Sequence, residues 1–99
     1  MNIKLINRGT TGELVMEGRL DSVTAPEAED IFLQTAERFD KVILNMADLE
    51  YVSSAGLRAI KRISMAMVKK SGTLTLTNVR KMVMEVFEMT GFAGLLTIE

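Results

Sequence analysis

Two adjacent serines, Ser53 and Ser54, carry hydroxyl groups at a point where an apolar segment gives way to a helical pattern. A serine hydroxyl can take up a phosphoryl group, which adds about −1.5 to −2 charges near neutral pH. Free amides and the positive end of the helix dipole make a helix start favourable for such an anion. The small residues Ala55 and Gly56 follow, and they would let another protein bring its nucleotide close to the backbone. These residues are therefore candidates for a phosphorylation site that a protein partner recognises.

The serine pair also has a purely structural interpretation. Serine is among the preferred helix caps, so two serines before a helix are by themselves only a helix-start signal. Arg58, one helical turn beyond Ser54, could pair with a phosphate or with an acidic partner, or it could lie in solvent on an exposed helix face. The residues alone leave these alternatives open.

The composition argues against most kinds of catalysis. The chain has no cysteine and no histidine, which removes thiol nucleophiles, the usual zinc ligands and the usual general base. It also lacks the glycine-rich lysine motif that binds nucleotide phosphates. We therefore expect a protein that is not an enzyme and that uses no metal and no cofactor.

Charge and hydropathy give expectations about location and partners. The sequence has no long apolar stretch and its start does not resemble a leader, so we expect a cytoplasmic protein without membrane insertion. Net charge is −1, with ten acidic and five basic residues over 1–50, against three acidic and seven basic residues over 51–99. Because no basic cluster is interleaved with aromatic residues, we expect an acidic protein partner and no nucleic acid.

Hydrophobic periodicity and turn residues predict the elements that must position the serines. The strands are expected at 3–6, 13–17, 41–46, 73–77 and 95–98. The helices are expected at 26–38, 54–70 and 79–89. We expect Gly18 to end the second strand, Thr24 to cap the first helix, and the stretch 47–53 to be irregular.

This order of elements predicts an α/β fold. Strands that are joined through helices normally run parallel with right-handed crossovers, whereas the first two strands form an antiparallel hairpin. We expect a mixed, mostly parallel sheet of four to five strands covered by helices, in one domain over residues 1–99. The two serines then follow the carboxyl end of a strand, where binding sites gather in such sheets.

Three segments together resemble the STAS family, the domain of anti-sigma factor antagonists and of sulphate-transporter tails. The segments are Gly18-Arg19-Leu20-Asp21 with Thr24-Ala25, the strand at 42–46, and Asp48-Leu49 through Ser53-Ser54-Ala55-Gly56-Leu57. The resemblance covers essentially the whole chain and implies a STAS-type fold. One departure is Ser53, because many antagonists have aspartate just before the phosphorylated serine.

The resemblance implies a partner-switching role. In similar bacterial proteins, a serine kinase of the GHKL ATPase type doubles as the anti-sigma factor and phosphorylates the serine that matches Ser54. The unmodified form binds the kinase and frees sigma factor, phosphorylation ends the binding, and a serine phosphatase restores it. Ser54 is thus the expected phosphorylation site, with Ser53 as the alternative.

The resemblance also implies which residues contact the partner. Asp21 follows the second strand, in a loop that STAS resemblance places near the serine. The expected contact residues are Asp21, Ser53, Ser54, Ala55, Gly56 and Arg58. An alternative is a constitutive scaffold or regulatory subunit, similar to the STAS components of membrane transport systems, which would use the same segment as a docking surface without phosphorylation.

Eight methionines are present, and those on the last two predicted helices include Met65, Met82, Met84 and Met89. We expect most methionines to lie in the core. Exposed methionines would instead favour a soft, adaptable surface for a partner helix or a small oligomer.

Overall fold

The computed structural model describes residues 1–94 and 96–99 of the 99-residue chain. The strands are β1 (Asn2–Arg8), β2 (Thr11–Leu20), β3 (Lys41–Val52), β4 (Thr73–Thr77) and β5 (Thr97–Ile98). The helices are α1 (Ala25–Arg38), α2 (Ser54–Lys69) and α3 (Lys81–Met89), with a short 3-10 helix η1 (Phe92–Gly94). The predicted order is confirmed. Leu95, which we expected to open the last strand, lies outside the described residues.

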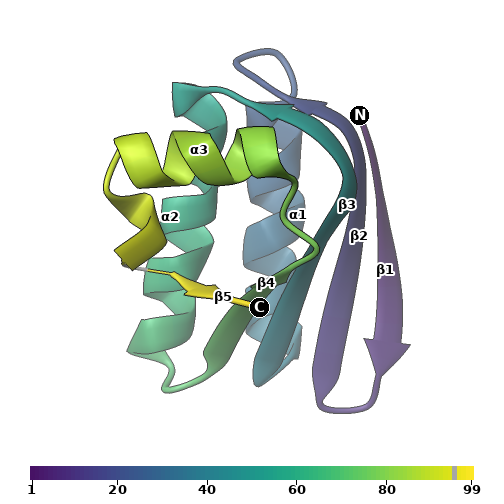
Figure 1. Ribbon diagram of the computed structural model, residues 1–99. Coiled ribbons are helices and arrows are strands. Elements are labelled where there is room, and N and C mark those ends of the chain that lie inside the picture. The colour runs from purple at the N-terminus through teal and green to yellow at the C-terminus, as the bar shows by residue number, and fades with distance from the viewer. Residues whose placement is uncertain (95) are drawn as a thin grey trace.

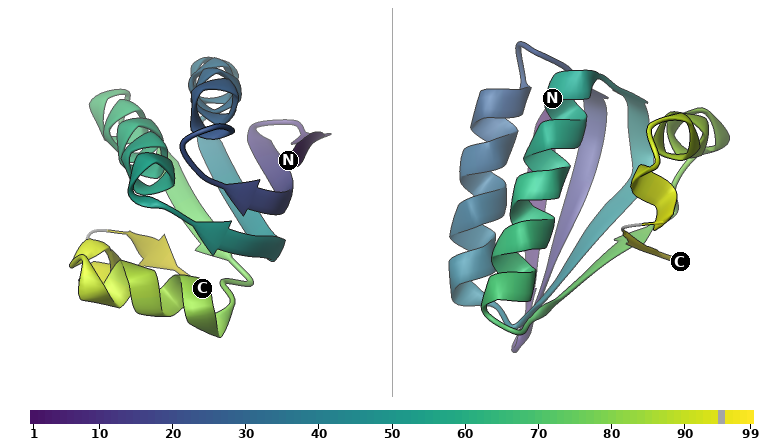
Figure 2. Two further views of the ribbon diagram at one scale, coloured as in Figure 1. Left: turned by 90° about the horizontal axis from the view of Figure 1, so that it is seen from above. Right: turned by 90° about the vertical axis from the view of Figure 1, so that its left-hand side faces the viewer.

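The strands form one five-stranded sheet in the order β1-β2-β3-β4-β5. β1 runs antiparallel to β2, and each later pair of neighbours is parallel. α1 and α2 lie side by side on one face of the sheet, whereas α3 crosses β3 on the other side (Figures 1 and 2). The predicted mixed, mostly parallel α/β architecture is confirmed.

The core fills the space between the sheet and its two long helices. As far as Met16 on β2 and Met46 on β3, every second residue is buried, as in Leu14 and Leu44. α2 meets them with Ile60 and Ile63, which lie three residues apart on one helix face. Burying each such side chain stabilises the fold by about 1.5–3 kcal/mol, so these layers fix where β3 ends and α2 begins.

β3 is longer than the sequence predicted. It continues through residues 47–52, which we expected to be irregular, and pairs with β2 as far as Val52. Its buried residues change spacing from two to three at Met46, Leu49 and Val52. Two register shifts against β2 cause this change, because each bulge inserts one extra residue into β3.

β2 likewise runs past its predicted end. Gly18 lies inside the strand with φ of 108°, a backbone conformation that residues other than glycine rarely adopt. The strand continues to Leu20. The helix ends differ slightly from the prediction. α2 stops at Lys69, one residue before its predicted end. α3 begins at Lys81, two residues after its predicted start, because Arg80 is extended at φ −68° and ψ 153°.

The prediction that most methionines are core residues is wrong. Met16, Met46 and Met67 are buried. Four others are exposed, with exposed fractions from 40% to 87%: Met1, Met65, Met82 and Met89.

Candidate functional site

The ends of β2 and β3 bring two loops together at one edge of the sheet. Leu20 pairs with Val52, the last residues of the two strands. The backbone N–H of Ser53 then donates to the Leu20 carbonyl oxygen at 2.8 Å. The loop that follows β2 therefore lies beside the serine pair that follows β3, as STAS resemblance led us to expect for Asp21.

The two serines have different environments. Ser53 is the N-cap of α2, with extended φ of −93° and ψ of 178°, and its Oγ accepts a hydrogen bond from the Gly56 N–H at 3.3 Å. Ser54 is the first residue of the helix and is exposed. Among the described residues its hydroxyl has no hydrogen-bond partner. Ser53 is thus the helix cap, as the structural interpretation expects, whereas the Ser54 hydroxyl is exposed and makes no bond to the described residues that would hinder its modification.

This difference gives a stability prediction. Ser53→Ala is expected to lower the free energy of unfolding by about 0.5–1 kcal/mol, because it leaves the Gly56 amide uncapped. Ser54→Ala, which removes an exposed hydroxyl from the next residue, should change it by less than about 0.5 kcal/mol. Urea denaturation of the two variants measures the contrast, and equal losses would contradict the separate roles.

Asp21 organises the loop after β2. One carboxylate oxygen, Oδ1, accepts hydrogen bonds from the backbone N–H groups of Val23 at 3.0 Å and Thr24 at 3.1 Å. The backbone bond from Thr24 is the main reason that the pKa of Asp21 is lowered from its ordinary 3.8, with a smaller contribution from Arg19. At neutral pH the Asp21 carboxylate is therefore negatively charged, and it is held in the loop that lies beside the serine pair.

Thr24 does not cap α1 as predicted. It occupies the N-cap position, but its backbone is helical and its side chain makes no capping bond. Instead, Thr24 Oγ1 donates to the Arg19 carbonyl at 2.8 Å and accepts from the Asp21 N–H at 2.9 Å. The hydroxyl faces backward into the loop, so it holds Asp21 in place.

Gly56 lies inside the molecule against β2. A Cβ added at this position would be 2.7 Å from Leu20 Cγ and 2.8 Å from the Leu20 carbonyl oxygen. Real Cβ atoms essentially never make contacts under 3.0 Å, so only glycine lets α2 approach β2 this closely. Gly56 is buried, and its effect on the surface is to set the position of Ser54.

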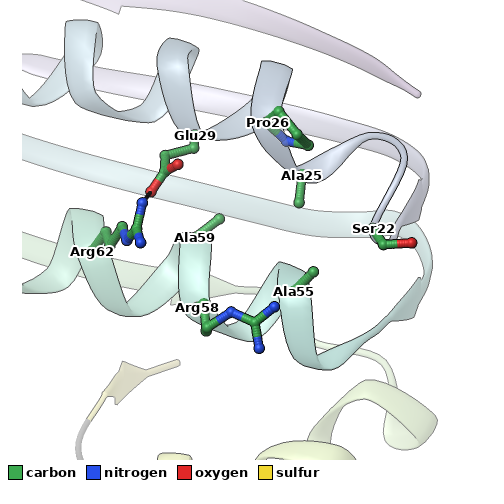
Figure 3. Close-up of a pocket in the computed structure, with 8 residues that line it drawn as sticks. All are labelled: Ser22, Ala25, Pro26, Glu29, Ala55, Arg58, Ala59 and Arg62. Carbon is green, nitrogen blue, oxygen red and sulfur yellow. Dashed lines mark hydrogen bonds and ion pairs between the residues drawn. The ribbon is translucent and has the colours of Figure 1, made fainter.

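Ala55 and Arg58 line a cleft of about 280 Å³ between the first turns of α1 and α2 (Figure 3). Arg62 crosses the gap between the helices and forms an ion pair with Glu29 at 2.6 Å. Arg58 is exposed, and it has no carboxylate partner in the described part of the chain. A guanidinium in this state is available to an anion near the start of α2.

Sequence reasoning missed several residues around the site. Ser22 lines the same cleft from the β2–α1 loop. Arg19 stacks over the Tyr51 ring, with 4.4 Å between the guanidinium carbon and the ring centroid. The signal that could have found this pair is strand register, because Arg19 and Tyr51 are partners in the extended part of β2 and β3 that we had expected to be loop.

Within residues 1–94 and 96–99, nowhere do three or more acidic, histidine or cysteine side chains group in a way that could hold a metal ion. No helix there has both the length and the apolar character needed to cross a membrane.

Comparison with known proteins identifies the family. The sequence model of the STAS domain matches residues 2–99. The chain belongs to the STAS domain family. The predicted membership is therefore confirmed, and the match spans both strand ends and the serine pair described above.

Two relatives by sequence and one solved structure show what this STAS protein is similar to. BtrV of Bordetella bronchiseptica, named as a putative anti-sigma factor antagonist, is 32% identical over 80 residues, which are 77% of this chain and 69% of BtrV. The anti-sigma-B factor antagonist of Staphylococcus epidermidis is 26% identical over 99 residues, 99% of this chain and 92% of the relative. The Bacillus cell fate determinant SpoIIAA in its phosphorylated form matches with a TM-score of 0.77 at 16% identity, over 99% of this chain and 91% of that one.

Proposed function

We propose that this STAS protein is an anti-sigma factor antagonist that is switched by phosphorylation of Ser54. The observation that carries the proposal is the exposed Ser54 hydroxyl, which has no partner among the described residues and lies beside the Asp21 loop. Both relatives by sequence are named as antagonists of anti-sigma factors, and SpoIIAA, which has a similar fold, exists in a phosphorylated form.

In this proposal Ser54 accepts the phosphate and Ser53 keeps its capping bond. A serine kinase of the GHKL ATPase type transfers the γ-phosphoryl group of ATP to Ser54 Oγ, ADP leaves, and the hydroxyl proton passes to a base of the kinase. The chain supplies only the acceptor, which agrees with its lack of histidine and with a role that is not enzymatic. The phosphate then lies at the positive end of α2, which favours it by about 0.3–1 kcal/mol.

The unphosphorylated surface binds the anti-sigma factor through three features. Asp21 offers a fixed negative charge to a cationic group of the partner, Ala55 allows close approach, and Arg58 binds an acidic group. Gly56 acts indirectly by holding the first turn of α2 against Leu20. Because Arg58 lies one turn beyond Ser54, it can also pair with the phosphate and so leave its partner contact.

The partners follow from this cycle. The kinase is itself the anti-sigma factor, so binding it frees sigma factor, and a serine phosphatase returns Ser54 to its unmodified state. The protein acts as one STAS domain over residues 1–99, in the cytoplasm, without membrane insertion and without binding nucleic acid.

The first experiment locates the phosphate and the partner together. The protein is purified from its own cells as wild type, Ser53→Ala and Ser54→Ala, and phosphopeptides and copurifying proteins are identified by mass spectrometry. We expect phosphoserine at position 54 in the wild type and in Ser53→Ala, and none in Ser54→Ala. The Ser54→Ala variant should retain a GHKL-type kinase.

Two results would contradict the proposal. Phosphate on Ser53 would assign the switch to the other hydroxyl. An unmodified protein whose partners are the same in all three forms and include no GHKL-type kinase would instead establish a constitutive scaffold.

A further inference from the structure

A groove with an apolar floor follows the second half of α2. It has a volume of about 360 Å³, and its apolar residues come from α2 and from the segment around η1: Met65, Val68, Phe92 and Leu96. Met65 and Val68 have exposed fractions of 61% and 74%. Apolar side chains that gather and remain this exposed are typical of an interaction surface.

The charges around the groove have one sign. Lys61 and Lys69 line it, one helical turn to either side of Met65, and no carboxylate lines it among the described residues. An occupant must therefore combine apolar side chains with acidic ones.

The outer face of α3 has this composition. Met82 and Met89 have exposed fractions of 70% and 87%. The exposed charged residues of this helix are two acidic ones, Glu85 and Glu88, and one basic one, Lys81. Met82, Glu85 and Met89 form one stripe at spacings of three and four residues. No described part of the same chain covers these two methionines.

The groove and the α3 face are neighbours. α3 leads directly into η1, whose Phe92 lines the groove. The right-hand view of Figure 2 faces this side of the molecule, with α2 running along it, and α3 and η1 beside it. The two surfaces therefore adjoin, and a second copy that contacts one lies close to the other.

We propose that two copies of the chain pair through these surfaces, with the outer face of α3 of each copy in the α2 groove of the other. Under two-fold symmetry each contact is made twice, and the assembly closes as a dimer. Lys61 and Lys69 of one copy face Glu85 and Glu88 of its partner, and the flexible methionines fill the groove.

In the proposed dimer Ser54 remains accessible. Met65 is eleven residues beyond Ser54 on α2, or about 16 Å along the helix axis at 1.5 Å per residue. Each copy thus keeps its Ser54 surface, and the pairing stands whether or not Ser54 is phosphorylated.

Charge reversal on the full chain tests the pairing by sedimentation equilibrium. A groove variant carries Lys61→Glu with Lys69→Glu, and a helix variant carries Glu85→Lys with Glu88→Lys. Each variant alone is expected to raise the dimer dissociation constant at least about tenfold, because like charges then face one another. An equal mixture of the two variants should regain wild-type affinity, because both contacts of the mixed dimer join opposite charges.

The control is Lys4→Glu, which reverses an exposed charge on β1 and should leave the dimer unchanged. Circular dichroism verifies that every variant is folded. A wild type that stays monomeric up to millimolar concentration would overturn the proposal and leave the groove to a different protein. So would a mixture of folded variants that remains monomeric.

Discussion

Replacing Ser54 with aspartate is expected to weaken binding to the anti-sigma factor by about 100-fold, or roughly 2.7 kcal/mol. In the proposed complex Ser54 is packed against the partner, because it is exposed and belongs to the segment that is bonded to the end of β2. A carboxylate there must be desolvated, and the adjoining loop already carries the negative charge of Asp21. Like charges in one interface cost several kcal/mol. Titration calorimetry with the purified partner measures the change.

Two matched variants separate the switch from general effects of charge. Ser54→Ala should bind within about threefold of wild type, because it removes an exposed hydroxyl and adds no charge. Ser71→Asp adds one negative charge beyond the opposite end of α2, at an exposed residue whose positive φ aspartate tolerates, and should not change the affinity. Equal affinity of Ser54→Asp and wild type would contradict the proposed switch.

The order of strands and helices could be predicted because it depends on hydrophobic patterns that are visible within short stretches of the sequence. Alternating residues such as Leu74 and Leu76 indicate β4, and its predicted bounds agree with the structure. The end of β3 could not be predicted in this way. Its two bulges give the buried residues Met46, Leu49 and Val52 a spacing of three, which matches neither a regular strand nor a helix.

The place of the two serines in the fold could be predicted from the sequence, but the difference between their local environments could not. Placing Ser53 and Ser54 after a parallel strand needs only the order of elements. Deciding which serine caps α2 depends on one backbone geometry, because both residues have the same side chain. The same limit applies to Thr24, whose type suits a cap but whose hydroxyl turns toward Arg19 and Asp21.

The two ends of α2 carry different kinds of surface. Its first turn combines a free hydroxyl, a small residue and Arg58, which suits a contact that one phosphate can abolish. Its second half presents Met65 and Val68 between lysines, which suits a lasting apolar contact. A rigid helix, packed on the sheet through Ile60 and Ile63, keeps these surfaces apart, so a change at Ser54 need not disturb the groove.

Gly56→Ala is expected to lower the free energy of unfolding by about 1–2 kcal/mol, although alanine is the better helix former by about 1 kcal/mol. The new methyl group would lie 2.8 Å from the Leu20 carbonyl oxygen, and that oxygen cannot move away without losing its 2.8 Å hydrogen bond from Ser53. Overpacking costs about 1–3 kcal/mol, and a contact under 3.0 Å with a backbone atom belongs in the upper part of that range, above the gain in helix propensity. Thermal unfolding should show Tm lowered by about 4–8 °C per kcal/mol.

The substitution should also affect phosphorylation of Ser54, because the first turn of α2 must shift to relieve the contact with Leu20. We expect phosphorylation of folded Gly56→Ala by the partner kinase to be slower by about tenfold, since Ser54 moves relative to Asp21. Gly94→Ala is the matched control: a Cβ there meets nothing within 4 Å, so stability and phosphorylation should both stay near wild type. If Gly56→Ala were as stable and as readily phosphorylated as Gly94→Ala, close packing of α2 on β2 would not be what positions Ser54.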